Sequence, residues 1–222
     1  KYLFLMSTEG TSANTADNFD VYLDVAGTRF PVVSDAANYA GMEPLATTNV
    51  DSYFIGAIAN ISANTTFQLF AATPNGTTSA FVRNRRIIAV RLDVFGAENI
   101  GVFYSENLSE LNVGGGCLVS AKCTRTTLTF TPGAQADFLV MAFGLSQSNT
   151  NSAYTWQELT GAINGAPEVS LQQGGHDIKQ YSSGAQEDYL PFSYAEIIDL
   201  QAQSQTFRHK YWNTQNDGIT KN

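Results

Sequence analysis

Short apolar or alternating runs recur along the whole chain, and their regular separation by turn residues is the feature that most restricts the fold. Runs such as 19–25 (FDVYLDV) and 137–144 (DFLVMAFG) have strand length, and breaks such as 73–76 (TPNG) are typical of tight turns. This spacing predicts an all-β chain built as a sandwich or barrel. The runs expected as strands are 2–7, 19–25, 52–61, 65–72, 86–95, 101–106, 117–123, 126–132, 137–144, 154–159, 188–198 and 206–212.

The runs also repeat at a constant shift along the chain. Leu3 aligns with Leu139, Tyr53 with Tyr189, and other identities follow the same shift. A repeat of this length predicts two copies of one β domain. We therefore expect two tandem antiparallel β-sandwich domains, at 1–96 and 117–222, joined by a linker at 97–116. The stretch 193–203 has helical propensity, but its counterpart in the first copy has a strand pattern, so a strand is expected there.

Each copy lacks one terminal element. The strand-like run at 117–132 precedes the second copy and has no counterpart before Lys1. The run at 81–93 closes the first copy, and the second copy reaches Asn222 without a counterpart to it. The chain also opens without Met or a signal peptide, so a slice of a longer or processed polypeptide is expected. The missing strands are expected to lie outside this sequence or to come from a neighbouring subunit.

The charge of the chain restricts its partners. The 222 residues include 12 Lys and Arg against 20 Asp and Glu, which gives a net charge of -8. This balance disfavours general affinity for nucleic acid or anionic membranes. No apolar run approaches the ~18 residues of a membrane-spanning helix. We therefore expect neither nucleic acid nor membrane among the partners.

No metal or cofactor site is predicted. Cys117 and Cys123 are the only cysteines, and their spacing fits a short-loop disulfide or two free thiols equally well, but no zinc pattern. Asp17, Asp20 and Asp24 do not have the spacing of an EF-hand calcium loop. Glycines 114–116 precede a strand and not a helix, so a hinge is expected there and not a phosphate cradle.

No catalytic residue is predicted either, and the chain is not expected to be an enzyme. His176 and His209 lack a nucleophile in a known motif and are expected at the surface. Carboxylates that could serve glycoside hydrolysis are more simply interpreted as a charged rim; they are Glu158, Glu168, Glu187, Asp188 and Glu196. Aromatic residues that could stack on a sugar are more simply interpreted as packing; they are Tyr154, Trp156, Tyr211 and Trp212.

Four arginines lie within 81–93 (FVRNRRIIAVRLD), the densest positive run in the chain. Strict alternation places Arg83, Arg85 and Arg91 on one face with Ile87 and Asp93, and Asp93 is expected to pair with Arg91. The same alternation places Arg86 on the opposite face, which is otherwise apolar, so Arg86 is expected at a rim or beside a carboxylate. Because the arginines do not converge, the run predicts a sheet-closing strand and not an anion-binding patch.

Three stretches resemble a β-sandwich module of tailed-phage structural proteins: 126–144 (TTLTFTPGAQADFLVMAFG), 83–95 (RNRRIIAVRLDVF) and 20–30 (DVYLDVAGTRF). The resemblance implies jelly-roll-like domains and a virion component. It carries no catalytic residues.

From the residues and this resemblance we expect a non-enzymatic structural protein of a tailed-phage particle, present in the extracellular virion. It would serve either as a capsid decoration or head fibre, or in a tail or fibre, and would assemble with copies of itself and other virion proteins. A host-surface glycan is a further expected partner. The alternative is an extracellular adhesin, a pilus-like subunit or a carbohydrate-binding module.

Overall fold

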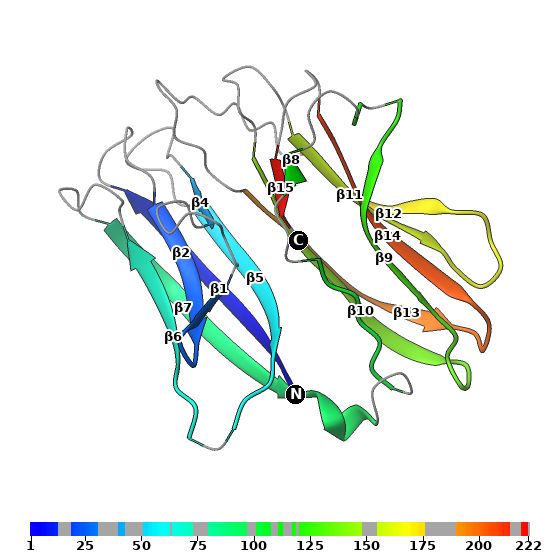
Figure 1. The fold of residues 1–222 in the computed structure, drawn as a ribbon, viewed down its shortest axis with the longest axis horizontal. Coiled ribbons are helices and arrows are strands. Elements are labelled where there is room, and N and C mark those ends of the chain that lie inside the picture. Colours follow the sequence, from blue (N-terminus) through cyan, green and yellow to red (C-terminus); the bar gives the residue numbers. More distant parts are fainter. Residues whose placement is uncertain are drawn as a thin grey trace.

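The computed structural model describes residues 1–12, 19–30, 40–42, 51–62, 64–72, 80–96, 101–107, 111–112, 117–118, 120–147, 155–175, 190–213 and 219–221. The chain is all-β, and its antiparallel sheets form two tandem sandwiches that lie side by side (Figure 1). The first half contains β1 (Tyr2–Ser12), β2 (Phe19–Val25), β3 (Thr28–Phe30), β4 (Ala40–Met42), β5 (Asp51–Ala59), β6 (Phe67–Ala72) and β7 (Ala80–Arg91), followed by a 3-10 turn at Leu92–Phe95. The second half contains β8 (Leu111–Asn112), β9 (Cys123–Phe130), β10 (Ala136–Gln147), β11 (Thr155–Ala162), β12 (Val169–Gly175), β13 (Leu190–Leu200), β14 (Gln205–Asn213) and β15 (Ile219–Lys221).

The two halves share one pattern of strand pairing. In the first, β1 lies between β5 and β7, and β2 lies between β6 and the short strands β3 and β4. In the second, β10 lies between β13 and β15, and β11 lies between β12 and β14. The register of the paired strands agrees as well. Val25 lies opposite Phe67 in the first half, and its repeat counterpart Gly161 lies opposite Phe207 in the second. The sequence repeat therefore corresponds to a repeat of topology.

Each half has its own apolar core, formed by the side chains that alternate strand positions send inward. The first is centred on Phe4, Met6 and Leu23, and the second on Leu159, Leu200 and Phe207. The domain boundaries at 96 and 117 stay a prediction. Within the expected linker, β8 pairs with β15.

The halves meet across the outer faces of two sheets. Phe54 of β5 lies against Phe143 of β10, with 5.6 Å between ring centroids. Gly56, one step along the same face of β5, lies beneath that ring so closely that a methyl group added to it would overlap the ring. A glycine is therefore required here for the two sheets to approach.

The structure corrects three of the expected strands. Residues 101–106 form no strand, although they lie against the second half through the ring of Phe103, which stacks on Phe130 at 4.2 Å. In the expected strand 117–123, the described residues before Cys123 lie in no strand: the Ala121 N–H donates to the Leu118 carbonyl, Cys117 and Cys123 form a disulfide, and β9 begins only at Cys123. The apolar pattern at 92–95 belongs to the 3-10 turn and not to β7.

The stretch with helical propensity, at 193–203, is strand through Leu200, as predicted from its repeat partner. Within the described residues, no helix combines the length and the apolar character needed to cross a membrane.

We expect Gly56→Ala to lower the free energy of unfolding by about 1–3 kcal/mol, because the added methyl must displace the Phe143 ring in a packed interface. Gly133→Ala is the matched control, since no atom lies near a methyl at that turn position, and it should change stability by less than about 0.5 kcal/mol. Urea denaturation followed by circular dichroism measures both. Equal effects of the two substitutions would show that the halves do not pack tightly at Gly56.

Candidate functional site

One face of the second half gathers charged and aromatic side chains in a single row, which we name the outer ladder. It covers the outward side of β11 and β14, where alternate residues of the two strands lie opposite each other: Trp156 with Trp212, Glu158 with Lys210, and Thr160 with Arg208. Lys122 and Glu168 join it from the segments before β9 and before β12. The alternation of Arg208, Lys210 and Trp212 in the sequence is a signal that could have identified this row.

At one end of the outer ladder, Lys122 links a carboxylate to an aromatic pair. Its Nζ lies 2.8 Å from an Oε2 oxygen of Glu158, whose side chain is almost fully buried. The same ammonium lies 4.2 Å from the centroid of the Trp212 ring, a cation–π distance. Trp212 in turn stacks on Trp156, with 5.9 Å between centroids and 8° between planes. The charge of Glu158 is therefore paired, as a buried carboxylate requires.

At the other end, Glu168 accepts from three donors. Lys210 Nζ lies 2.5 Å and Arg208 a guanidinium nitrogen 2.6 Å from its oxygens, and the Thr160 hydroxyl donates to it as well. These contacts, that of Lys210 first, hold the pKa of Glu168 below its ordinary value. Glu168 is therefore an anion at neutral pH.

Of the two carboxylates that share this face, Glu168 does not have the chemistry of the general acid in a glycosidase pair. A general acid needs a raised pKa so that it holds its proton at working pH, whereas Glu168 is stabilised as an anion and Glu158 bonds a lysine. Glu196 lies on β13 in a different sheet, where it accepts a hydrogen bond from the Tyr194 hydroxyl. Glu187 and Asp188 lie outside the described residues.

The four aromatic residues do not form one exposed platform. Trp212 is only 2% exposed, and Tyr211 is buried on the opposite, core-facing side of β14. Trp156 is partly exposed, and Tyr154 lies outside the described residues. A sugar cannot stack on a buried ring, so the packing interpretation is confirmed for Trp212 and Tyr211.

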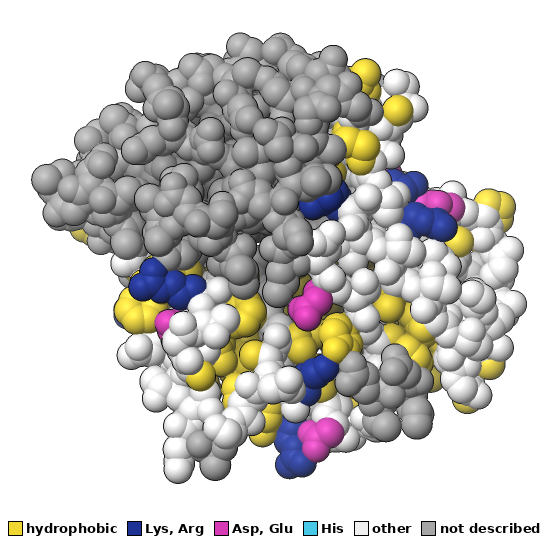
Figure 2. Space-filling view, viewed as in Figure 1, with side chains coloured by type: hydrophobic (Ala, Val, Ile, Leu, Met, Phe, Trp, Pro, Cys, Tyr) yellow, Lys and Arg dark blue, Asp and Glu magenta, His cyan; other side chains and the backbone are white. Residues whose placement is uncertain are grey.

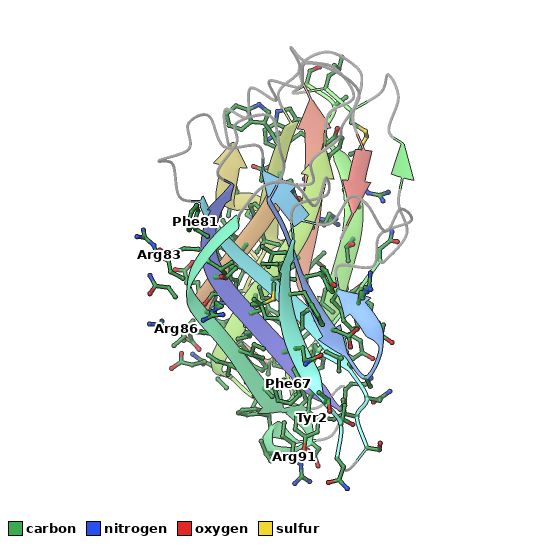
Figure 3. The ribbon with its side chains drawn as sticks, turned by 90° about the vertical axis from the view of Figure 1, so that its left-hand side faces the viewer. Tyr2, Phe67, Phe81, Arg83, Arg86 and Arg91 are labelled. Carbon is green, nitrogen blue, oxygen red and sulfur yellow. A yellow bond between two sulfur atoms is a disulfide. The ribbon has the colours of Figure 1, made fainter. Side chains whose placement is uncertain are left out.

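The arginine run forms β7, an outermost strand of its sheet in the described part of the chain (Figure 3). The alternation predicted for it was wrong, because a β-bulge interrupts the pairing with β1 where Asn84 adopts a positive φ of 52°. Beyond the bulge the faces exchange, so Arg83 and Arg86 both lie opposite outward residues of β1. Ile87 instead packs on the core.

Two of these arginines pair with carboxylates. Arg83 donates to Glu9 at 2.8 Å, and Arg91 forms a two-pronged pair with Asp93, as predicted, at 2.6 Å for both bonds. Among the described carboxylates none lies within ion-pair distance of Arg86, so of the two placements expected for it the structure shows the rim. It is exposed at the sheet margin.

The remaining metal and acid–base candidates are dispersed. Asp24 accepts a hydrogen bond from the Gly27 N–H at 2.9 Å and so closes the β2–β3 turn. The side chain of Asp20, Asp17 as a whole, His176 and the glycines at 114–116 lie outside what the structure describes. In the described part of the chain, no three His, Cys, Asp or Glu side chains group as metal ligands.

His209 was expected at the surface and is instead buried in the second core, where its ring stacks on Phe192 at 5.0 Å. Its Nε2 has no hydrogen-bond partner in the described structure. Burial first, and the nearby Arg125 charge second, lower the pKa of His209 to about 4. The signal that could have identified this is the alternation of Phe207, His209 and Tyr211, which places His209 on the apolar face of β14 although its immediate neighbours are charged.

Several large apolar side chains lie on strand faces that point away from both cores. Leu139 of β10 and Ile197 of β13 are direct cross-strand neighbours and are 63% and 68% exposed. Charged side chains are few on the face seen in Figure 2, where they form small separate groups among polar and hydrophobic surface. The other exposed large hydrophobic residues are Phe67, Phe70, Phe81, Ile88, Val94, Phe95 and Val169.

No protein-family model and no curated protein matches the sequence. Among solved structures, the chain is similar to the N-terminal CBM22-1–CBM22-2 tandem domain of Xyn10C from Paenibacillus barcinonensis. The match covers 99% of this chain and 79% of that one, with 8% sequence identity and a TM-score of 0.30. Similarity at this level carries no argument about function, and the description of the fold rests on the sheets themselves.

We expect acid to destabilise the second half through His209. The unfolded chain binds a proton on this histidine below about pH 6.5, whereas the folded chain does so only near pH 4. Stability should therefore be complete above pH 6.5 and fall by about 3 kcal/mol as the pH drops to 4. Both tryptophans of the chain lie in this half, so urea denaturation followed by tryptophan fluorescence isolates its unfolding.

His209→Phe is the matched variant, because phenylalanine keeps the ring stacked on Phe192 without a titrating group. It should remove most of the loss between pH 6.5 and 4.5. An unchanged pH dependence in this variant would assign the loss to other groups.

Proposed function

We propose that this chain is a non-enzymatic structural protein that acts by assembling in multiple copies. The observation that carries the proposal is the exposed cross-strand pair Leu139 and Ile197 on the outer face of β10 and β13. Single exposed apolar residues are ordinary on protein surfaces, but adjacent ones on a sheet face favour contact with another protein. On the same outer face Phe143 already forms the contact with the first half, so this sheet surface is suited to protein packing.

The finer proposal is a virion component of a tailed phage, and it rests on the sequence resemblance. Its partners would be copies of itself and other virion proteins, and its position a capsid decoration, head fibre, tail or tail fibre. The low charge content and the exposed apolar sheet surface suit such a role, because assembly proteins work through packing and display and not through a reaction centre. The non-enzymatic part is supported by the outer ladder, where Glu168 is held as an anion and Glu158 pairs with Lys122.

Assembly should depend on the exposed apolar pair. We expect the double substitution Leu139→Lys with Ile197→Lys to reduce self-association at least tenfold, because it places two like charges in the contact. Stability of the single chain should change by less than about 0.5 kcal/mol per position, since both side chains are exposed. Gln172→Lys, at an exposed position of β12, is the matched control. Sedimentation velocity over a concentration series measures the association.

A chain that stays monomeric at all concentrations, and is absent from particles or filaments viewed by electron microscopy of its source material, would contradict the proposal. Immunolabelling of purified tailed particles tests the virion assignment separately. Label on a cell surface with none on particles would instead favour the adhesin alternative.

A further inference from the structure

The first half has two outermost strands on the same side, β6 and β7, and they differ in how their free edges are protected (Figure 3). The edge formed by β7 carries four arginines and a bulge, which are common devices against unwanted strand pairing. The edge formed by β6, with the sequence FQLFAA, has no charge, proline, glycine or bulge. No described strand pairs with its far side.

In the second half, a strand occupies the position that corresponds to the far side of β6. There, the far side of β14 pairs with β9, and Phe207 lies opposite Leu128. The ring of Phe130 from β9 lies 6.1 Å from that of Phe207 and nearly parallel to it. Phe207 is accordingly only 4% exposed.

Phe67 of β6 holds the register position that Phe207 holds in β14. Its ring points to the first core, where it lies 5.4 Å from Phe4. It is nevertheless 38% exposed. The difference between the two phenylalanines follows from the presence of β9 beside one and the lack of a described strand beside the other.

We propose that the free edge of β6 is an acceptor for one extended segment of another polypeptide chain. The segment would add as an antiparallel strand in the place that β9 occupies in the second half, which is β-strand addition. Its recognition chemistry is that of β9: an extended segment with large apolar side chains at alternate positions, as at Leu128 and Phe130, to cover Phe67. This inference deepens the assembly role proposed above. It depends on that role in one respect, namely that the added strand comes from another chain.

Charge argues against a second copy placed edge to edge as the donor. Because β7 lies beside β6 on the same side, two sandwiches joined through β6 would bring their β7 strands together. Arg85 and Arg86 are exposed near the middle of β7, so an antiparallel approach would place like charges opposite each other. A single strand without a sandwich behind it avoids this repulsion.

A labelled peptide of residues 123–132, with Cys123→Ser, is the probe. Fluorescence anisotropy should show saturable binding to the full chain, and a peptide carrying Leu128→Ser and Phe130→Ser should bind at least tenfold more weakly. This comparison leaves the protein unaltered, so misfolding cannot produce it. Hydrogen exchange should slow at the β6 amides when the unmodified peptide binds.

Two protein variants locate the site. Phe67→Lys should abolish binding, whereas Phe81→Lys, at an exposed phenylalanine of β7, should bind as the unmodified chain does. No saturable binding, equal binding of the serine-substituted peptide, or protection away from β6 would overturn the proposal. Self-association of the chain that Phe67→Lys removes would also overturn it, by making a second copy the occupant. Assembly through Leu139 and Ile197 is measured without the peptide, so either proposal can fail alone.

Discussion

An antiparallel strand sends only every second side chain into a core, and this chain has apolar side chains on both faces of its central strands. In β1, Phe4 and Met6 are fully buried in the first core, while Leu3 and Leu5 lie on the opposite face. That face belongs to the sheet through which the halves meet, where Gly56 allows the Phe143 ring to approach. The side-by-side arrangement of the sandwiches therefore follows from strands that are apolar on both sides, which is unusual for antiparallel sheets that face water.

The same register supports two kinds of outer surface. On the outer face of the first half, Tyr22 of β2 lies opposite Phe70 of β6, and their rings stack at 4.9 Å. The equivalent position in the second half pairs Glu158 with Lys210 within the outer ladder. Backbone pairing thus fixes which residues are neighbours, while the side chains decide whether neighbours interact through ring stacking or through charge. For this reason a shared topology says little about shared function.

Much of the fold could be predicted from the sequence, because periodicity and turn residues are local signals. The run at 19–25 is a strand over its full length, and the repeat identified 193–203 as strand through Leu200 against its helical propensity. The errors arise where a bulge or a covalent bond changes the pattern. A single bulge at Asn84 exchanges the faces of β7, and the apolar run that ends at Cys123 is linked by a disulfide, with β9 beginning only at that cysteine.

The candidate site was less predictable than the fold. Glu158 and Glu168 were recognised as candidates, but their neighbours Lys122 and Lys210 come from separate strands or segments, and only tertiary structure brings them together. His209 shows the same limit, since a histidine between two cations has a surface pattern, yet strand alternation points it into the core. Strand alternation gives the face of a residue only where no bulge interrupts it, as one does in β7, and it does not show which side chains lie across from that residue.

The two halves also complete their sandwiches differently. In the first, β7 pairs with β1 over nearly its whole length, whereas β15 pairs with only three residues at the end of β10. Where the rest of β10 has no described strand beside it, the ring of Phe103 covers Phe130 and lies 6.2 Å from Phe138. An aromatic side chain can cover apolar surface as a strand does, but it cannot supply a ladder of backbone hydrogen bonds. Burying the core and pairing the edge strand are therefore separate requirements in this fold. In the second half, the ring of Phe103 meets the first requirement without meeting the second.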